Sequence, residues 1–279
     1  MKDYLSLSKP RIALLVMMTA ALGYRLAGGE NDWGLLWTIL GTGLASAACG
    51  CLNQALEGPQ DALMKRTAGR AVAAGRITKT RAIAFGLLLT VSGLGILWVG
   101  AGRLPALLTL ATVFGYVVLY TPLKQVTPQT TWIGAAAGAA PPLIGWAAAR
   151  GSLAPQAWVL FGIQFLWQIP HFLALFWMYR EEYAAAGFRT APVVDPRGGL
   201  TAAQIAMHSF TVLPMALAPV FFGMAGKGYG FAALLLSTGY LALGMKASWS
   251  LARADTRRLF LASLAYLPLL FSALLIGGV

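Results

Sequence analysis

The sequence predicts an all-α, polytopic membrane protein with nine transmembrane helices, organised as a single domain over residues 1–279. Of the 279 residues, 58% are hydrophobic and 11% are charged, and the mean hydropathy is +0.69. A soluble domain carries about 25% charged residues, so this composition excludes a soluble fold. Apolar runs of about 20 residues, long enough to cross a bilayer, occur nine times. The predicted spans are 12–28, 34–56, 82–101, 104–121, 131–149, 156–178, 202–224, 229–250 and 258–278.

The basic residues predict a cytoplasmic N-terminus. In that orientation 17 of the 21 Lys and Arg residues fall in cytoplasmic loops, and four fall on the other side: Arg25, Arg103, Arg150 and Lys227. Such an excess is typical of cytoplasmic loops and supports the count of nine. The net charge of +12 therefore reflects topology, and no soluble basic face is left for a nucleic-acid partner. The first span lacks a small-residue cleavage site, so we expect it to remain as a helix in the lipid bilayer.

Asn53, Glu57 and Asp61 form a polar cluster where the second span ends. The chain has nine Asp and Glu residues, and two of them lie here, four residues apart. Oxygen ligands of this kind hold Mg²⁺, which in turn binds phosphate oxygens. Asn53 and Glu57 are four residues apart and share a helix face. We expect Gly58-Pro59 to end this helix, which places Asp61 on a turn or in a short helix. A solvated interfacial loop is the alternative.

Glu181 and Glu182 form a second acidic cluster, after the sixth span. Four predicted helices separate the two clusters, and this even number brings both to the cytoplasmic face. We therefore predict one site built from two loops, in which the carboxylates bind Mg²⁺ and the metal binds a diphosphate. Nearby basic residues would neutralise the remaining phosphate charge. They are Lys65, Arg66, Arg70, Lys124 and Arg180.

His171 lies within the sixth span, directly after Pro170. An ionisable side chain there is costly unless it faces the bundle interior or a partner. Two interpretations stay open: a role toward a cation or a metal porphyrin, or a bond to a carbonyl that Pro170 frees. Trp167 is one of several aromatic residues expected either to line an apolar chamber or to anchor at the interface. His208 is expected to be structural.

Three small patterns in the spans have structural interpretations. Cys49 and Cys51 are expected to pack as small side chains, because a C-x-C pair without further ligands is a poor zinc site. Gly134 and Gly138 form a GxxxG pattern typical of close helix packing. Pro141-Pro142 is predicted to break the fifth span and to open backbone toward a cavity.

Together these segments resemble the UbiA superfamily of intramembrane prenyltransferases and, within it, the heme o synthase (protoheme IX farnesyltransferase) family. The resemblance runs in order over residues 8–200, and the last three spans match in hydropathy alone. The matching segments are Ser8-Lys9-Pro10-Arg11, Asn53 to Thr67 with Glu57, Asp61 and Arg66, Tyr120 to Lys124, Gly138 to Trp146, Trp167 to Phe172, Tyr179 to Tyr183 and Ala191 to Val194. The segments around Pro141 and His171 are the ones specific to the heme branch.

The resemblance implies a UbiA-type bundle that uses Mg²⁺, with farnesyl diphosphate as donor and heme b as acceptor, giving heme o and diphosphate. It implies an inner (plasma) membrane location with a cytoplasmic mouth, and heme a synthase or terminal oxidase assembly as a partner. Residue by residue, it places Asn53, Glu57 and Asp61 on the first acidic motif, and Glu182 with Glu181 on the second. It places Arg66 and Lys124 at diphosphate-contacting positions and His171 toward the porphyrin.

The chain departs from the family pattern at a few positions. Glu57 and Glu182 stand where many members have Asp, which keeps the charge and lengthens the reach. Gln125 replaces a second basic residue, which predicts one fewer phosphate contact. Three other functions stay open: prenylation of an aromatic quinone precursor, a non-catalytic heme-binding membrane protein, and a transporter. A transporter would place ionisable residues near the membrane midplane, whereas nearly all charges here lie at helix ends, which favours an enzyme.

Overall fold

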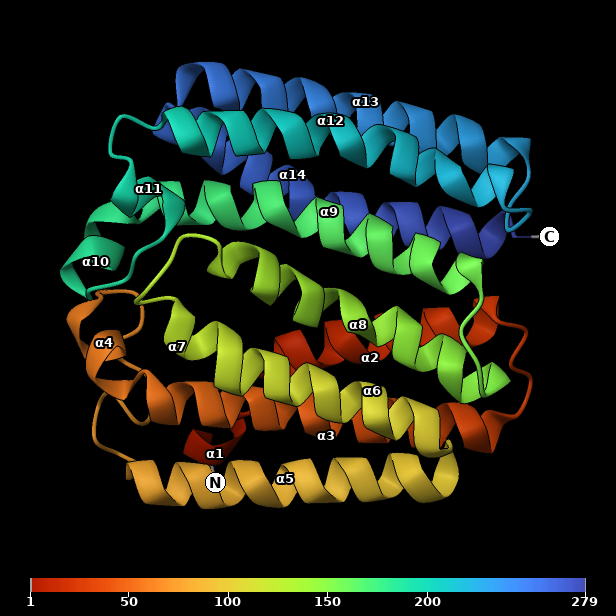
Figure 1. The fold of residues 1–279 in the computed structure, drawn as a ribbon, viewed down its shortest axis with the longest axis horizontal. Helices are drawn as coiled ribbons and strands as arrows, with labels where there is room; N and C mark the ends of the chain where they lie inside the picture. Colours follow the sequence, from red (N-terminus) through yellow and green to blue (C-terminus); the bar gives the residue numbers. More distant parts are fainter. Residues whose placement is uncertain (1, 279) are drawn as a thin grey trace. The chain divides into compact units, whose positions relative to one another are not determined.

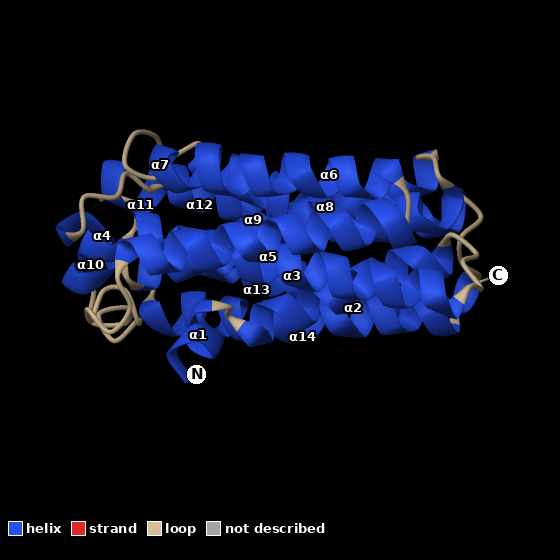
Figure 2. Ribbon diagram, turned by 90° about the horizontal axis from the view of Figure 1, so that it is seen from below, coloured by secondary structure: helices blue, strands red, loops and turns tan. Residues whose placement is uncertain are grey.

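The computed structural model describes residues 2–278, and its secondary-structure elements in that range are all helices (Figure 2). The predicted all-α class is confirmed. The chain forms two compact units. Unit 1 comprises Met1–Thr127, Ala140–Leu153 and Glu182–Phe188, and unit 2 comprises Pro128–Ala139, Ala154–Glu181 and Arg189–Val279. The single-domain organisation stays a prediction.

Unit 1 is built around α3 (Asp32–Leu56), which packs against α2, α5 and α6 (Figure 1). Asn31 caps α3, because its side chain accepts hydrogen bonds from the N–H groups of Trp33 and Gly34. The other helices of the unit are α1 (Lys2–Leu7), α2 (Pro10–Leu26), α4 (Gly58–Leu63), α5 (Lys79–Gly100), α6 (Arg103–Phe114), the π-helix η1 (Gly115–Tyr120) and α7 (Thr121–Leu123).

Glycine allows α3 and α5 to approach each other closely. A Cβ atom on Gly41 would lie 2.5 Å from Cγ of Leu97, and one on Gly93 would lie 2.8 Å from the carbonyl oxygen of Gly41. The polar residues of α3 are satisfied within the helix, since the Thr38 and Thr42 hydroxyls donate to carbonyls one turn back at 2.7 and 2.6 Å. Glycines therefore bring the two backbones close together, and the α3 hydroxyls need no partner from α5.

Unit 2 is built around α9 (Pro155–Met178), which packs against α12 and α14. In Figure 1, α12 and α13 also lie side by side. The remaining helices of this unit are α11 (Ala191–Val194), α12 (Gly199–Phe221), α13 (Lys227–Ser250) and α14 (Arg253–Ile276). Two helices, α8 (Thr130–Arg150) and α10 (Arg180–Ala185), contribute residues to both units.

The prediction that Pro141-Pro142 breaks the fifth span is wrong, because α8 runs through both prolines. A proline at position 142 cannot donate to the carbonyl of Gly138, four residues earlier. The Gln164 side chain replaces that bond, with Nε2 donating to the Gly138 carbonyl at 2.8 Å. The carbonyl is satisfied from α9, so the helix continues without opening its backbone to a cavity.

Among the described residues, seven helices are long and apolar enough to cross a membrane: α3, α5, the run Arg103–Leu123, α9, α12, α13 and α14. The other two predicted spans correspond to α2 and α8. The count of nine transmembrane helices and the cytoplasmic N-terminus stay predictions. Large apolar side chains are exposed on these helices, as at Val99 (88%) and Trp249 (94%). Such surfaces suit contact with lipid tails rather than water.

Candidate active site

The first acidic cluster lies where α3 ends and α4 begins. Asn53 occupies the last turn of α3, Glu57 follows the helix and Asp61 lies within α4. The Glu57 N–H donates to the Asn53 carbonyl at 2.9 Å, and the Asp61 N–H donates to the Glu57 carbonyl at 2.7 Å. Pro59 takes the start of α4, where a missing N–H is tolerated. All three side chains are buried, at 1 to 3% exposure, so the alternative of a solvated loop does not describe them.

Each of these three polar groups meets a different basic side chain. Lys124 Nζ lies 2.7 Å from Glu57 Oε1. Arg70 Nη1 bridges both oxygens of Asp61, at 2.6 and 2.7 Å. Buried carboxylates require such partners, because an unpaired charge away from water is strongly unfavourable. The cluster is therefore balanced by cations drawn from other segments of unit 1.

Lys124 lies at the end of an irregular helical segment, from which its side chain contacts Glu57. The π-helix η1 precedes α7, and Lys124 directly follows α7. Its ammonium also lies 4.4 Å from the ring centre of Tyr120, a cation–π contact. Burial lowers the pKa of Lys124, but the charge of Glu57, its hydrogen bond to Lys124 and the nearby Tyr116 and Tyr183 together raise the pKa more, so the net shift is upward. Lys124 therefore stays protonated at neutral pH.

Thr121 connects Asn53 to the same segment. Asn53 Nδ2 donates to Thr121 Oγ1 at 3.3 Å, and that hydroxyl donates to the carbonyl of Tyr116 at 2.9 Å. The same carbonyl also accepts the backbone N–H of Thr121, so both the backbone and the side chain of Thr121 bond to the π-helix. Helical segments of this kind frequently lie at functional sites.

Lys9 also contacts the cluster, although the sequence pattern did not predict it. Its Nζ donates to Asn53 Oδ1 at 2.9 Å, across 44 residues of sequence. Its backbone is left-handed, with φ of 47°, immediately before Pro10 opens α2. Burial, together with the positive charges of Arg70 and Lys124, lowers the pKa of Lys9 to about 7. The one available signal was the Ser8-Lys9-Pro10-Arg11 motif, to which no role had been assigned.

The second acidic cluster is divided between the units. Glu182 belongs to unit 1, and its Oε2 accepts a hydrogen bond from the Arg66 backbone N–H at 3.2 Å. Arg66 Nη2 lies 3.2 Å from the hydroxyl of Tyr183. The structure thus brings Glu182 to the loop that follows Asp61. Glu181 is exposed and belongs to unit 2.

Within the described residues 2–278, neither Arg180 nor Lys65 pairs with an acidic side chain. Arg180 belongs to unit 2, where its guanidinium carbon lies 4.6 Å from the ring centre of Trp177. Lys65 is exposed. Within residues 2–278, no group of three His, Cys, Asp or Glu side chains is arranged to hold a metal ion. The assignment of Asn53, Glu57, Asp61, Glu181 and Glu182 to Mg²⁺ stays a prediction.

His171 lies in α9 of unit 2, between two aromatic rings. Its ring centre is 5.3 Å from that of Trp167 and 4.7 Å from that of Phe260, and both pairs are stacked. Its Nδ1 is 2.7 Å from Ser263 Oγ, and that hydroxyl donates to the Phe260 carbonyl at 2.5 Å. Because the hydroxyl hydrogen is directed to the carbonyl, Nδ1 is the donor toward Ser263. The partner is therefore a hydroxyl, not a carbonyl freed by Pro170, and the Nε2 lone pair stays available.

His208 has the structural surroundings expected of it. Its Nδ1 bonds to the Gln204 carbonyl of its own helix at 2.7 Å. Its ring meets Trp132 edge-on, with 4.7 Å between ring centres. Trp167 also has a structural bond, since its indole N–H donates to the Ser263 carbonyl at 2.9 Å.

Comparison with known proteins identifies the family of this chain. The UbiA prenyltransferase family matches residues 15–273. The chain is 41% identical to the protoheme IX farnesyltransferase of Solibacter usitatus, over 99% of this chain and 98% of that relative. A solved structure described as digeranylgeranylglyceryl phosphate synthase superposes with a TM-score of 0.83 at 13% identity, over 99% of this chain and 97% of the other.

A UbiA homolog from Archaeoglobus fulgidus, solved bound to GPP and Mg²⁺, superposes with a TM-score of 0.73 at 15% identity, over 98% and 99% of the two chains. These structures confirm the predicted UbiA-type fold. The family match and the 41% identical relative go further than the fold. They show that the chain belongs to the UbiA prenyltransferase family and is a multi-span membrane prenyltransferase.

Proposed function

We propose that this chain transfers the farnesyl group of farnesyl diphosphate to a vinyl group of heme b, with addition of water, giving heme o and diphosphate. The relative from Solibacter usitatus, 41% identical over nearly the whole chain, is named protoheme IX farnesyltransferase and supports both substrates. The observation that carries the proposal is the cluster in unit 1. Two buried carboxylates and an amide there each meet a separate basic side chain.

The basic side chains suit a diphosphate. Arg70 and Lys124 neutralise Asp61 and Glu57 in the ligand-free protein. If Asp61 and Glu57 held a metal ion, Arg70 and Lys124 would be free to bind phosphate oxygens. Arg66 adds a guanidinium on the same loop as Arg70. The polar groups of the cluster thus exchange partners when the substrate binds, and no charge is left buried and unpaired.

The donor set fits Mg²⁺. Asn53, Glu57, Asp61 and Glu182 offer hard oxygen ligands, the type that Mg²⁺ prefers. When bound, the metal neutralises the diphosphate and makes it a better leaving group. Glu181 stays a candidate ligand on the sequence pattern alone.

In the reaction, the bond between C1 of the farnesyl group and the diphosphate oxygen breaks, and the electron pair leaves with the diphosphate. Lys124, Arg70 and Arg66 stabilise the charge that develops on the leaving group. C1 then bonds to the terminal carbon of the heme vinyl group, and water adds to the inner vinyl carbon with release of one proton. The product carries a hydroxyethylfarnesyl group. Water must reach the second step but not the first, because water would quench the allylic cation.

The acceptor assignment involves unit 2. His171 offers an Nε2 lone pair, fixed in direction by the bond from Nδ1 to Ser263 and by the stacked rings of Trp167 and Phe260. A neutral imidazole held in this way suits an axial ligand of heme iron. We assign His171 to heme b on these grounds, with Trp167 against the porphyrin.

The location follows the loop charges. We place the protein in the inner (plasma) membrane, with the acidic cluster at the cytoplasmic face where 17 of 21 basic residues lie. Its product is a heme, so its partner is the machinery that converts or inserts heme o, namely heme a synthase or terminal oxidase assembly.

Expression of the chain in bacterial membranes, followed by mass spectrometry of the extracted hemes, tests this function. We expect a heme whose mass is increased by a farnesyl group and a hydroxyl group, and none in cells that carry an Asp61→Ala variant present in the membrane at the same level. Release of diphosphate with an unchanged heme profile would point to an aromatic quinone precursor as acceptor. Heme b bound without consumption of farnesyl diphosphate would identify a heme-binding protein. Either result contradicts the proposal.

A further inference from the structure

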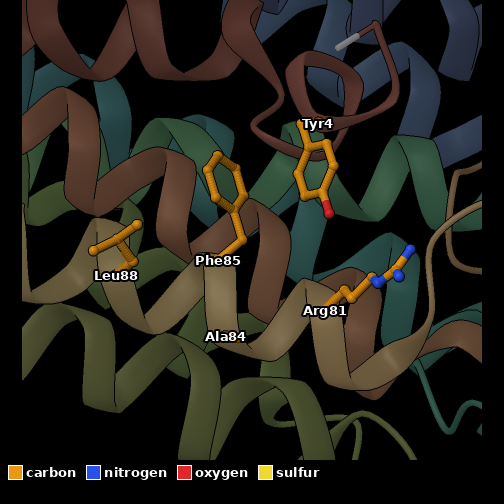
Figure 3. Close-up of a pocket in the computed structure, with 5 residues that line it drawn as sticks. All are labelled: Tyr4, Arg81, Ala84, Phe85 and Leu88. Atoms are coloured by element: carbon orange, nitrogen blue, oxygen red, sulfur yellow. The ribbon is translucent and has the colours of Figure 1, made fainter.

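A separate pocket lies away from the acidic cluster, at the start of α5. Its volume is about 490 Å³, and it is lined by Tyr4, Arg81, Ala84, Phe85 and Leu88 (Figure 3). Tyr4 comes from α1, and the other four residues follow one face of α5 at positions i, i+3, i+4 and i+7. The Tyr4 and Phe85 rings meet edge-on, with 5.0 Å between centres. None of these residues has a role in the proposed reaction.

The aromatic walls of the pocket are fixed in place. Tyr4 and Phe85 pack against a core that includes Leu7, Cys51 and Ala82, all fully buried. The aromatic part of the pocket is therefore positioned by α1 and α5 packing on α3, whereas Arg81, Ala84 and Leu88 are exposed.

The polar end of the pocket is positive. Within residues 2–278, the Arg81 guanidinium has no hydrogen bond or ion pair. The nearest acidic residue in sequence to the pocket, Asp3, is already paired with Arg76 at 2.8 Å. Lys2 and Lys79 flank the lining residues in sequence and are exposed. Arg81 also lies in the first turn of α5, where helix N–H groups favour an anion.

The other end of the pocket continues as an exposed apolar stripe down α5. Leu88 is 62% exposed and Val91 is 71% exposed. A Cβ atom on Gly95 would meet nothing within 4 Å, so this face of the helix is open. At 1.5 Å per residue, Arg81 and Val91 are about 15 Å apart along the helix, about half the 30 Å apolar thickness of a bilayer. The distance from the positive end of the pocket to the end of the apolar stripe thus matches the apolar thickness of one leaflet.

We propose that this pocket binds an anionic phospholipid. The phosphate bonds to Arg81 and to the Tyr4 hydroxyl, the glycerol region rests on Ala84 and Phe85, and an acyl chain follows Leu88 toward Val91. An anionic head group is preferred because Lys2 and Lys79 repel the cationic choline of a zwitterionic lipid. The lipid holds α1 against α5 and so stabilises the segment that leads to Lys9.

Native mass spectrometry of the full-length protein in detergent, titrated with phosphatidylglycerol or phosphatidylcholine, tests the proposal. Arg81→Gln has the matched control Lys79→Gln, which removes the same charge from the same turn but lies outside the pocket. Leu88→Asn has the matched control Leu87→Asn, since Leu87 is 52% exposed on a different face. Because the Arg81 guanidinium makes no hydrogen bond or ion pair within residues 2–278, Arg81→Gln should unfold at the wild-type temperature.

We expect tighter binding of one phosphatidylglycerol than of phosphatidylcholine by the wild-type protein. Loss of one charge-assisted hydrogen bond in Arg81→Gln should weaken phosphatidylglycerol binding about tenfold, while Lys79→Gln changes it less than about twofold. Leu88→Asn should weaken both lipids, and Leu87→Asn neither. Equal phosphatidylglycerol binding by Arg81→Gln and Lys79→Gln would overturn the site. Displacement of the lipid by millimolar glycerol phosphate would show a free-phosphate site and overturn the lipid assignment.

Discussion

Nη1 of Arg70 bridges the two carboxylate oxygens of Asp61, at 2.6 and 2.7 Å, in a site where Asp61 is 3% exposed. The Arg70 side chain is 25% exposed and enters from the loop after α4. This pair sets the resting state of the cluster, because Asp61 cannot stay charged and buried without a cation beside it. In the proposed function, the same carboxylate must exchange Arg70 for a metal ion.

Arg70→Met should therefore destabilise the metal-free protein. We expect a loss of about 2 kcal/mol, less than for a fully buried pair because Arg70 is partly exposed. The measurement is thermal unfolding in detergent with EDTA. Added Mg²⁺ should stabilise Arg70→Met more than the wild-type protein, because the unpaired carboxylate is already free to bind it.

The double variant Asp61→Asn/Arg70→Met is the control for that prediction. It removes the charge together with its partner, so it should recover most of the lost stability and lose the response to Mg²⁺. If Arg70→Met unfolds at the wild-type temperature and responds to Mg²⁺ like the wild type, the exchange of partners is wrong.

Lys124 should act on the rate of the reaction. Its ammonium pairs with Glu57 at 2.7 Å and its pKa is raised, so it is a protonated donor for the leaving diphosphate. Lys124→Met should lower kcat by about 10²- to 10³-fold, the usual effect of removing a donor that stabilises developing charge. Lys124→Arg keeps the charge and should recover part of this loss. Diphosphate release is the assay, and a Lys124→Met enzyme within about threefold of wild type would contradict this role.

Lys9 should position Asn53. Lys9→Met removes the hydrogen bond that fixes the Asn53 carbonyl oxygen at 2.9 Å. We expect about a tenfold loss of kcat and a weaker response to Mg²⁺, measured by the shift in unfolding temperature. Arg11→Met is the matched control, because Arg11 is exposed and lies two residues further along the same motif. Equal behaviour of the two variants would assign Lys9 to structure alone.

His171 should bind heme b through Nε2. His171→Ala should remove the absorption change that follows addition of heme b to the purified protein, while His208→Ala should leave it intact because His208 bonds within its own helix. Ser263→Ala removes the acceptor that orients the imidazole and should weaken heme binding about three- to tenfold, as for other groups that orient a ligand. Unchanged heme spectra in His171→Ala would move the acceptor site elsewhere.

Hydropathy alone was enough to predict the long helices, but not the short helices α1, α10 and α11. Each of the nine predicted spans overlaps one described helical segment, because a bilayer needs about 20 apolar residues in a row. The error at Pro141-Pro142 has a specific cause. The compensating hydrogen bond comes from Gln164, on the next helix, and no pattern within α8 predicts it. No local sequence pattern predicts the division into two units either.

The candidate site was predictable in its residue types and not in its pairings. The spacing of Asn53, Glu57 and Asp61 placed them together, since they follow one another at four-residue intervals across the end of α3 and the start of α4. Lys124 lies 67 residues from Glu57, and Lys9 lies 44 residues from Asn53. Which cation meets which acid depends on how separate helices pack, and a count of loop charges carries no such information.

The coupling of diphosphate release to heme modification can be measured in a single assay, with purified protein in detergent, farnesyl diphosphate, heme b and Mg²⁺. We expect one farnesylated, hydrated heme for each diphosphate released. Activity should be lost on chelation by EDTA, restored by Mg²⁺, and absent from a folded Asp61→Asn variant. Full turnover by Asp61→Asn, or diphosphate release with heme b unchanged in mass, would contradict the proposed function.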